Sequence, residues 1–202
     1  MQIALPELDS PVTITLDPEH LFSDEEYLSF CEANPDLRLE RTSGGELVIV
    51  PPAGMESDFR SLEVSGELRK WARENGRGRA FGSSVEFLLP NGAALSPDAA
   101  WVSNERLAAL PKSDRKRFPH LTPEFVVEVM SPSDRLPTAK RKMSEGIANG
   151  VELAWLIDGD QRTVCVYRRH MEVRVLTGVG QIAGEGPVEG FVLELKSIWE
   201  GL

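Results

Sequence analysis

The spacing of apolar residues along the chain predicts helices and strands in mixed order. Three segments repeat apolar residues at helical spacing and are bounded by capping or breaking residues: 23–34, 55–75 and 136–149. Other stretches alternate or are continuously apolar, as strands are, and turn residues separate them: 37–41, 47–50, 79–81, 85–89, 97–102, 124–130, 152–157, 163–169 and 171–176. This mixture predicts an α/β or α+β domain, with helices packed on a mixed central sheet.

The segment from 124 to 157 predicts one supersecondary unit. EFVVEVM, from Glu124 to Met130, is nearly continuously apolar, which suits a strand covered on both faces. The helix at 136–149 and the apolar strand at 152–157 follow it at the length of a right-handed crossover. We therefore expect two parallel strands here with a helix between them.

The chain length and the absence of repeats and long linkers indicate one domain. The 202 residues suit a single core, and neither an internal repeat nor a long linker divides them. We expect one domain over 1–202, in which 1–20 form an extended N-terminal arm. No apolar run approaches the roughly 20 residues that span a bilayer, and the first residues do not resemble a signal peptide. These features predict a cytoplasmic protein with no membrane partner.

The charge and cysteine content exclude several classes of protein. The 22 basic and 32 acidic residues give a net charge of -10, which argues against unselective coating of nucleic acid. Basic residues nevertheless gather locally at 112–117 and 140–142. Cys31 and Cys165 lie far apart without metal-ligand spacing, which argues against a disulfide scaffold and against structural zinc.

Two carboxylates are candidates for chemistry. Glu128 interrupts an apolar strand, where an unpaired charge is costly, so it either lies at a solvated end, pairs with an arginine or binds a cation. Asp98 follows Pro97 before an apolar stretch and, taken alone, is a turn aspartate. Lys140 and Lys142 on the next helix could both approach Glu128, and helical phase does not choose between them. Serine-hydrolase elbows and glycine-rich phosphate loops are absent from the sequence.

An ordered set of motifs carries a family resemblance. The set is GELVIVPP, SPDAAWV, PEFVVEVMSPSD, KM and NGVELAWLIDGDQRTVCVYR. Over about 37–168, it resembles the Uma-two family of endonucleases, a branch of the PD-(D/E)XK, restriction-endonuclease-like superfamily. The resemblance implies a restriction-endonuclease-like mixed sheet flanked by helices, with an N-terminal hairpin and C-terminal strands.

The resemblance also implies a metal site. Asp98 and Glu128 match the metal-binding carboxylates, and the backbone carbonyl of Val129 is a further ligand. Glu63, on the first long helix, matches an auxiliary metal ligand. Mg²⁺ or Mn²⁺ is the implied ion, because carboxylates hold such a cation where it can neutralise a phosphate and activate water.

The lysine of the motif is displaced. Met130 stands where the superfamily has a lysine, and the family pattern assigns that role, as catalytic base or charge stabiliser, to Lys142 with Lys140 in reserve. Gly146 stands where family members often carry a tyrosine.

The implied function is a metal-dependent endonuclease that hydrolyses DNA as a homodimer. One alternative is a nuclease-fold protein without turnover that binds nucleic acid or regulates, which Met130, Gly146 and the acidic charge favour. Another is an interaction protein in which the two acids are structural.

Overall fold

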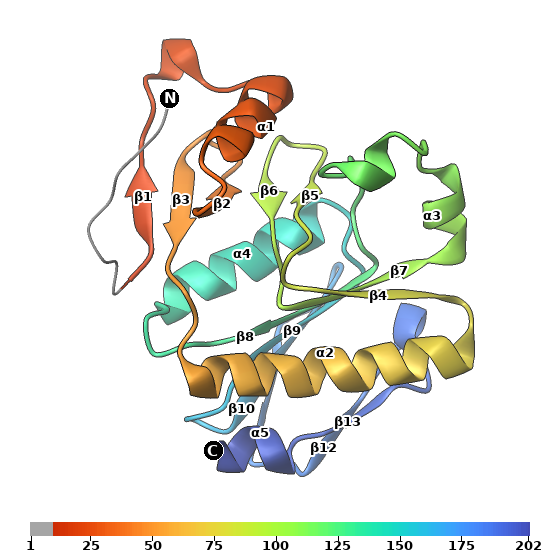
Figure 1. The fold of residues 1–202 in the computed structure, drawn as a ribbon. Coiled ribbons are helices and arrows are strands. Elements are labelled where there is room, and N and C mark those ends of the chain that lie inside the picture. The colour runs from red at the N-terminus through yellow and green to blue at the C-terminus, as the bar shows by residue number, and fades with distance from the viewer. Residues whose placement is uncertain (1–9) are drawn as a thin grey trace.

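The computed structural model describes residues 10–202, which form two main sheets and a small two-stranded ribbon (Figure 1). The predicted arm over 1–20 falls partly outside this range, since 1–9 are not among the described residues. Its described part contains β1, Val12–Ile14, which pairs antiparallel with β3, Leu47–Val50. This part of the arm is therefore a strand of a sheet.

The larger sheet has six strands in the order β11-β10-β9-β8-β7-β4. Their bounds are β4 Gly78–Gly82, β7 Ala99–Ser103, β8 Phe125–Val129, β9 Leu153–Asp158, β10 Thr163–Arg168 and β11 Arg174–Thr177. The parallel pair β8 and β9 is joined by α4, Leu136–Ala148, whereas the other neighbouring strands pair antiparallel. The predicted mixed sheet and its crossover unit are confirmed.

Strand alternation gives this sheet two covered faces. Four elements cover the first face: α2 Met55–Asn75, β12 Gln181–Ala183, β13 Val192–Glu194 and α5 Lys196–Glu200. Val127 and Trp155 pack on that side, whereas Val126 and Leu156 pack on the other side with Met143 of α4. Even-numbered positions of β8 therefore face α4, and odd-numbered positions face α2.

The second sheet has five strands in the order β1-β3-β2-β6-β5. It is built on the predicted hairpin, and its remaining bounds are β2 Arg38–Arg41, β5 Phe87–Leu88 and β6 Ala94–Leu95. Helix α1, Asp24–Ala33, covers it, with Tyr27 and Phe30 packed among Leu39 and Ile49. The sequence patterns predicted the hairpin and α1, but β1 and β6 are too short to give a signal of their own.

Helix ends follow the capping residues. At the start of α1, the Glu26 N–H donates to Ser23 Oγ and the Ser23 N–H donates to Glu26 Oε2, which completes a capping box. Gly76 ends α2 in the left-handed region, at a φ of 72°. A further short helix, α3, Asn104–Ala109, follows β7, and the Ser103 side chain accepts from the Arg106 N–H at its start. None of the helices within residues 10–202 has both the length and the apolar character needed to cross a membrane.

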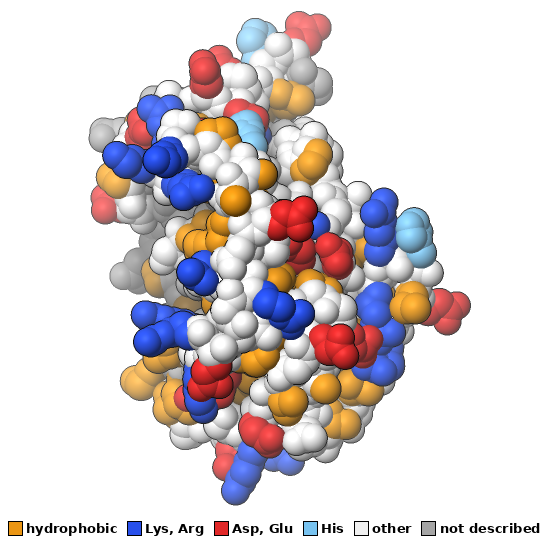
Figure 2. Space-filling view, turned by 90° about the vertical axis from the view of Figure 1, so that its right-hand side faces the viewer, with side chains coloured by type: hydrophobic (Ala, Val, Ile, Leu, Met, Phe, Trp, Pro, Cys, Tyr) orange, Lys and Arg blue, Asp and Glu red, His pale blue; other side chains and the backbone are white. Residues whose placement is uncertain are grey.

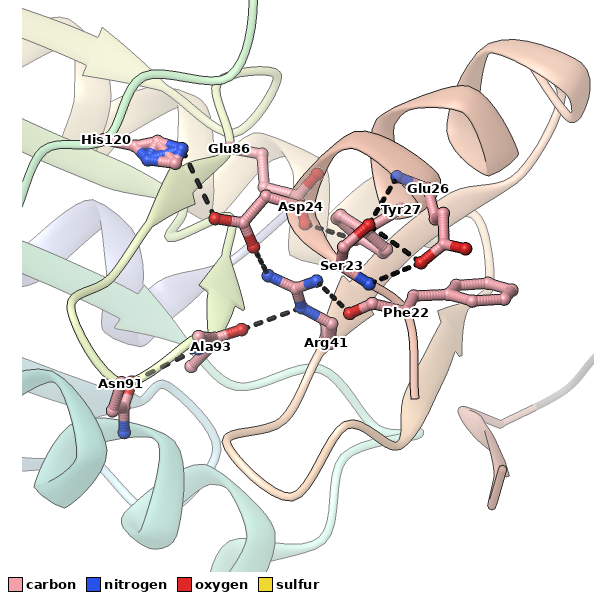
Figure 3. Close-up of polar contacts among 11 residues, drawn as sticks. Phe22, Ser23, Asp24, Glu26, Tyr27, Arg41, Glu86, Asn91, Ala93 and His120 are labelled. Atoms are coloured by element: carbon pink, nitrogen blue, oxygen red, sulfur yellow. Dashed lines mark hydrogen bonds and ion pairs between the residues drawn. The ribbon is translucent and has the colours of Figure 1, made fainter. Parts of the chain in front are cut away.

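A buried polar group fixes α1 to the second sheet (Figure 3). The Tyr27 hydroxyl donates to Glu86 Oε1 at 2.6 Å, and Glu86 is only 4% exposed. Arg41 forms an ion pair with Asp24, and its guanidinium lies 4.8 Å from the centre of the Tyr27 ring. Burial raises the pKa of Glu86 to about 8, although the Tyr27 hydroxyl opposes the shift.

Glu86→Gln should flatten the pH dependence of stability. This carboxyl has an ordinary pKa of 4.5 in the unfolded chain, whereas in the fold its pKa is about 8. The folded state binds more protons between these values, so the stability that Glu86 contributes is lost as pH rises through this window. Chemical denaturation at about pH 5 and about pH 8 should show a smaller loss in Glu86→Gln than in the wild type. Equal losses would contradict the burial of an ionisable group here.

Candidate active site

A cleft of about 660 Å³ lies where the end of β8 meets β2 and the first turns of α2 and α4. Its lining combines carboxylates and cations, among them Glu40, Asp98, Glu128, Arg38, Arg141 and Lys142. The cleft is thus formed by both sheets, and each sheet supplies charged side chains to it.

Asp98 and Glu128 lie across from each other beside this cleft. Strands β7 and β8 pair antiparallel with Ala99 opposite Val127, and continuing this register by one residue places Asp98 opposite Glu128. Opposed residues of an antiparallel pair point to the same face, with Cβ atoms about 4.5–5.5 Å apart. The Val129 N–H donates to Asp98 Oδ2 at 2.8 Å, which holds this carboxylate against the end of β8. Both predicted acids therefore share the face that α4 covers.

Lys142 reaches these acids from α4. Its Nζ donates to Glu128 Oε1 at 2.7 Å and to Glu40 Oε1 at 2.8 Å, and it lies 3.3 Å from the carbonyl oxygen of Ser96. An ammonium has three protons, and each has an acceptor here. Lys140, which helical phase allowed equally, is an exposed side chain of the same helix. The structure brings Lys142, and not Lys140, to Glu128.

Glu40 is the site residue that sequence reasoning missed. It lies on β2, its side chain is 10% exposed, and its Oε1 also accepts the Ser96 N–H at 3.0 Å. The three residues Leu39, Glu40 and Arg41 are all buried. The sequence feature that could have indicated Glu40 is the pair of adjacent charged residues, Glu40 and Arg41, within a short predicted strand. Charged residues beside a hairpin turn are usually solvated, however, and nothing in the local sequence distinguishes Glu40 from such residues.

Burial is the main influence on the charges of the site. It raises the pKa of Glu128 to about 8 against the attraction of Lys142, and Asp98 and Glu40 raise this pKa further. Burial also raises the pKa of Asp98, although the Val129 N–H and Lys142 oppose this. For Lys142, burial favours the neutral amine, but Glu128 and Glu40 outweigh it and raise the pKa. The site therefore combines carboxylates that need a positive neighbour with a lysine that keeps its proton.

The donor set fits a hydrated divalent cation. Glu128 Oε2 is buried and has no hydrogen-bond partner within the described residues, so one carboxylate oxygen remains available to a ligand. Mg²⁺ prefers oxygen ligands, is usually bound by one or two carboxylates and keeps several waters. In the part of the chain from 10 to 202, no cluster of three His, Cys, Asp or Glu side chains could hold a metal ion. A cation here would therefore be held by few protein ligands and completed by water.

The chain that carries this fold and cleft matches a known family. The family model Uma2, described as "Putative restriction endonuclease", matches residues 24–196. The chain belongs to the Uma2 family. No curated protein matches it.

Two solved structures compare with this Uma2 chain. One is described as a "putative nuclease belonging to DUF820" from Anabaena variabilis ATCC 29413, and it aligns with a TM-score of 0.71 and 19% identity. The alignment covers 87% of this chain and 96% of that chain, so the two share a fold. The other, the DrdV–DNA complex, aligns with a TM-score of 0.35 and 16% identity over 56% of this chain and 66% of that chain.

The remaining residues implied by the Uma2 resemblance lie in different surroundings. Glu63 is on α2, which covers the opposite face of the central sheet from α4, and the described lining of the cleft does not include it. Ser57 and Ser61, earlier on that helix, do line the cleft. A Cβ at Gly146 would lie 3.3 Å from the Val151 side chain, so this α4 position is closely packed and a larger side chain would need Val151 to move.

Lys142→Met should destabilise the fold by about 3–5 kcal/mol, because it leaves Glu40 and Glu128 buried without their cation. The loss should be larger at about pH 8 than at about pH 5, where the Glu128 carboxyl, whose pKa burial raises to about 8, can be protonated. Adding Glu40→Gln should recover part of the stability, since it removes one of the stranded charges. Urea denaturation of the two single variants and the double variant measures this coupling. Additive effects in that cycle would show that the ion pair contributes nothing.

Proposed function

We propose that this chain is a Mg²⁺-dependent endonuclease that hydrolyses phosphodiester bonds in DNA. The observation that supports this most is the meeting of Asp98, Glu128 and Lys142 in one cleft, with a Glu128 oxygen left free. Membership of the Uma2 family agrees with it. Reactions at phosphate need charge neutralisation and a positioned water, and this set of groups can supply both.

Asp98 and Glu128 would hold the metal ion, with the carbonyl of Val129 as a further ligand. When bound, Mg²⁺ or Mn²⁺ supplies positive charge to the phosphate oxygens and lowers the pKa of a coordinated water. Val129 also holds the Asp98 carboxylate through its N–H, so this strand end orients the first ligand. Glu128 would bind the ion through Oε2, because this oxygen has no hydrogen-bond partner within the described residues.

Lys142 would act as a charge stabiliser. Its Nζ contacts three oxygens, those of Glu40, Glu128 and Ser96, and only the protonated amine can donate to all of them. A fixed ammonium near the phosphate lowers the energy of a transition state that gains negative charge. Glu40 would position this ammonium, because it holds the lysine from β2 while Glu128 holds it from β8.

DNA binding by an acidic chain requires local positive groups. On the face shown in Figure 2, basic and acidic side chains are interspersed among uncharged ones and adjoin each other in places. The cleft adds Arg38, Arg135 and Arg141 near its carboxylates. We infer that phosphate contacts are made at the cleft, since the net charge of -10 repels DNA elsewhere.

Cleavage of plasmid DNA tests the proposed reaction. The wild type should cut with Mg²⁺ or Mn²⁺, and a chelator should stop it. Asp98→Asn and Glu128→Gln, which keep side-chain size, should each lower the rate by about 100-fold or more, because each removes a metal ligand. Binding without cleavage by the wild type would support the alternative of a nuclease-fold binding protein. Equal rates in all three chains would refute the site.

Calorimetric titration with Mg²⁺ separates the predicted ligands from each other. Asp98→Asn should weaken binding by about 10-fold or more, since a carboxylate ligand is lost. Glu63→Gln removes a charge of the same kind from α2, on the opposite face of the sheet, and should leave the affinity within about twofold. A loss in Glu63→Gln equal to that in Asp98→Asn would instead establish Glu63 as a ligand.

A further inference from the structure

Arg38 differs from the other arginines that the fold shields from solvent. Within the described residues, four of these shielded arginines form ion pairs with carboxylates, namely Arg41, Arg60, Arg106 and Arg168. Arg38 is also partly buried, yet it forms no ion pair in this part of the chain. A shielded guanidinium without a counter-ion is costly to bury, so a negative group is expected to meet it.

The contacts of Arg38 leave most of its donors free. Its Nη2 donates to the Ser96 carbonyl oxygen at 3.2 Å, whereas its Nε is buried and has no partner within residues 10–202. The same carbonyl oxygen lies 3.3 Å from Lys142 Nζ. Two cations, one from β2 and one from α4, therefore lie within reach of one backbone oxygen beside the carboxylates.

Arg38 also lies close enough to Asp98 to act on it electrostatically. Burial raises the pKa of the Asp98 carboxyl, and the Arg38 charge is among the groups that oppose this. The two side chains form no ion pair, so the N–H groups of the guanidinium are not taken up by Asp98 while it lies near this predicted metal ligand. A group that binds there would meet Arg38 and the metal-binding carboxylates together.

We propose that Arg38 binds the phosphate of the nucleic-acid substrate in this cleft. The guanidinium is a planar fork whose paired N–H groups match two oxygens of a phosphodiester, and such charge-assisted bonds are strong. Arg38 lies on β2, so a strand of the second sheet would bind the substrate phosphate, while strands of the larger sheet would supply the metal ligands. The inference rests on the proposed function and adds to it the residue that would engage the phosphate.

Fluorescence anisotropy with a labelled DNA duplex in Ca²⁺, read beside Mg²⁺-dependent cleavage, tests the proposal. Arg38→Met should weaken binding by about 10-fold or more, and it should reduce the slope of log affinity against log salt by about one. Arg69→Met is the matched control, because Arg69 is an exposed arginine of α2 outside the cleft lining. It should change affinity by about twofold or less.

The outcomes separate this inference from the nuclease proposal. If the wild type binds DNA without cutting it and Arg38→Met alone loses binding, the reaction is wrong and the phosphate site stands. If the wild type cuts DNA and the Arg38→Met and Arg69→Met variants match in affinity and rate, the phosphate site is overturned and the nuclease stands. Absence of saturable binding by the wild type also overturns it. Should Arg38→Met fail to fold, Arg38→Lys decides: reduced affinity supports the forked contact, and wild-type affinity overturns it.

Discussion

The buried ammonium of Lys142 is the interaction on which the site depends. It joins α4 to β2 through Glu40 and to β8 through Glu128, so one cation ties a helix to both sheets. Burial raises the pKa of the Glu128 carboxyl and so favours its protonated form, whereas the Lys142 ammonium favours the ionised carboxylate. The charges of Lys142, Glu40 and Glu128 therefore depend on one another. The same contacts fix the relative position of the two sheets at the cleft.

Strand alternation explains why a displaced lysine can serve this site. Glu128 occupies an even position of β8 and faces α4, and Met130 follows it on the same side, packed among apolar residues. The helix that covers this face can therefore deliver an amine to Glu128 without any change in the strand. Asp98 shares the face through the antiparallel register of β7. The geometry needed by the chemistry is thus set by which helix covers which face.

Local patterns predicted the parts of the molecule that local physics determines. The crossover from β8 through α4 to β9 follows from hydrophobic periodicity. The family resemblance supplied Glu128 and Lys142 from motifs along this stretch, and Asp98 from the SPDAAWV motif at β7. Glu40 could not be predicted, because its contact with Lys142 joins a strand of the second sheet to a helix that packs on the larger sheet, 102 positions further along the chain. The sequence also could not predict where Glu63 lies relative to the cleft, because the apolar stripe of a helix does not show which face of a sheet that helix covers.

The two oxygens of Glu128 show how a lysine and a metal ion can share one carboxylate. Oε1 accepts from Lys142, whereas Oε2 is buried and without a partner in the described residues. A cation bound through Oε2 would not compete with the amine for the same atom, so Lys142 could stay in place beside it. Glu40 gives Lys142 a second carboxylate contact. This contact does not involve either oxygen of Glu128. The lysine could then keep its proton and its place, while Asp98 and Glu128 would be the residues to hold the ion.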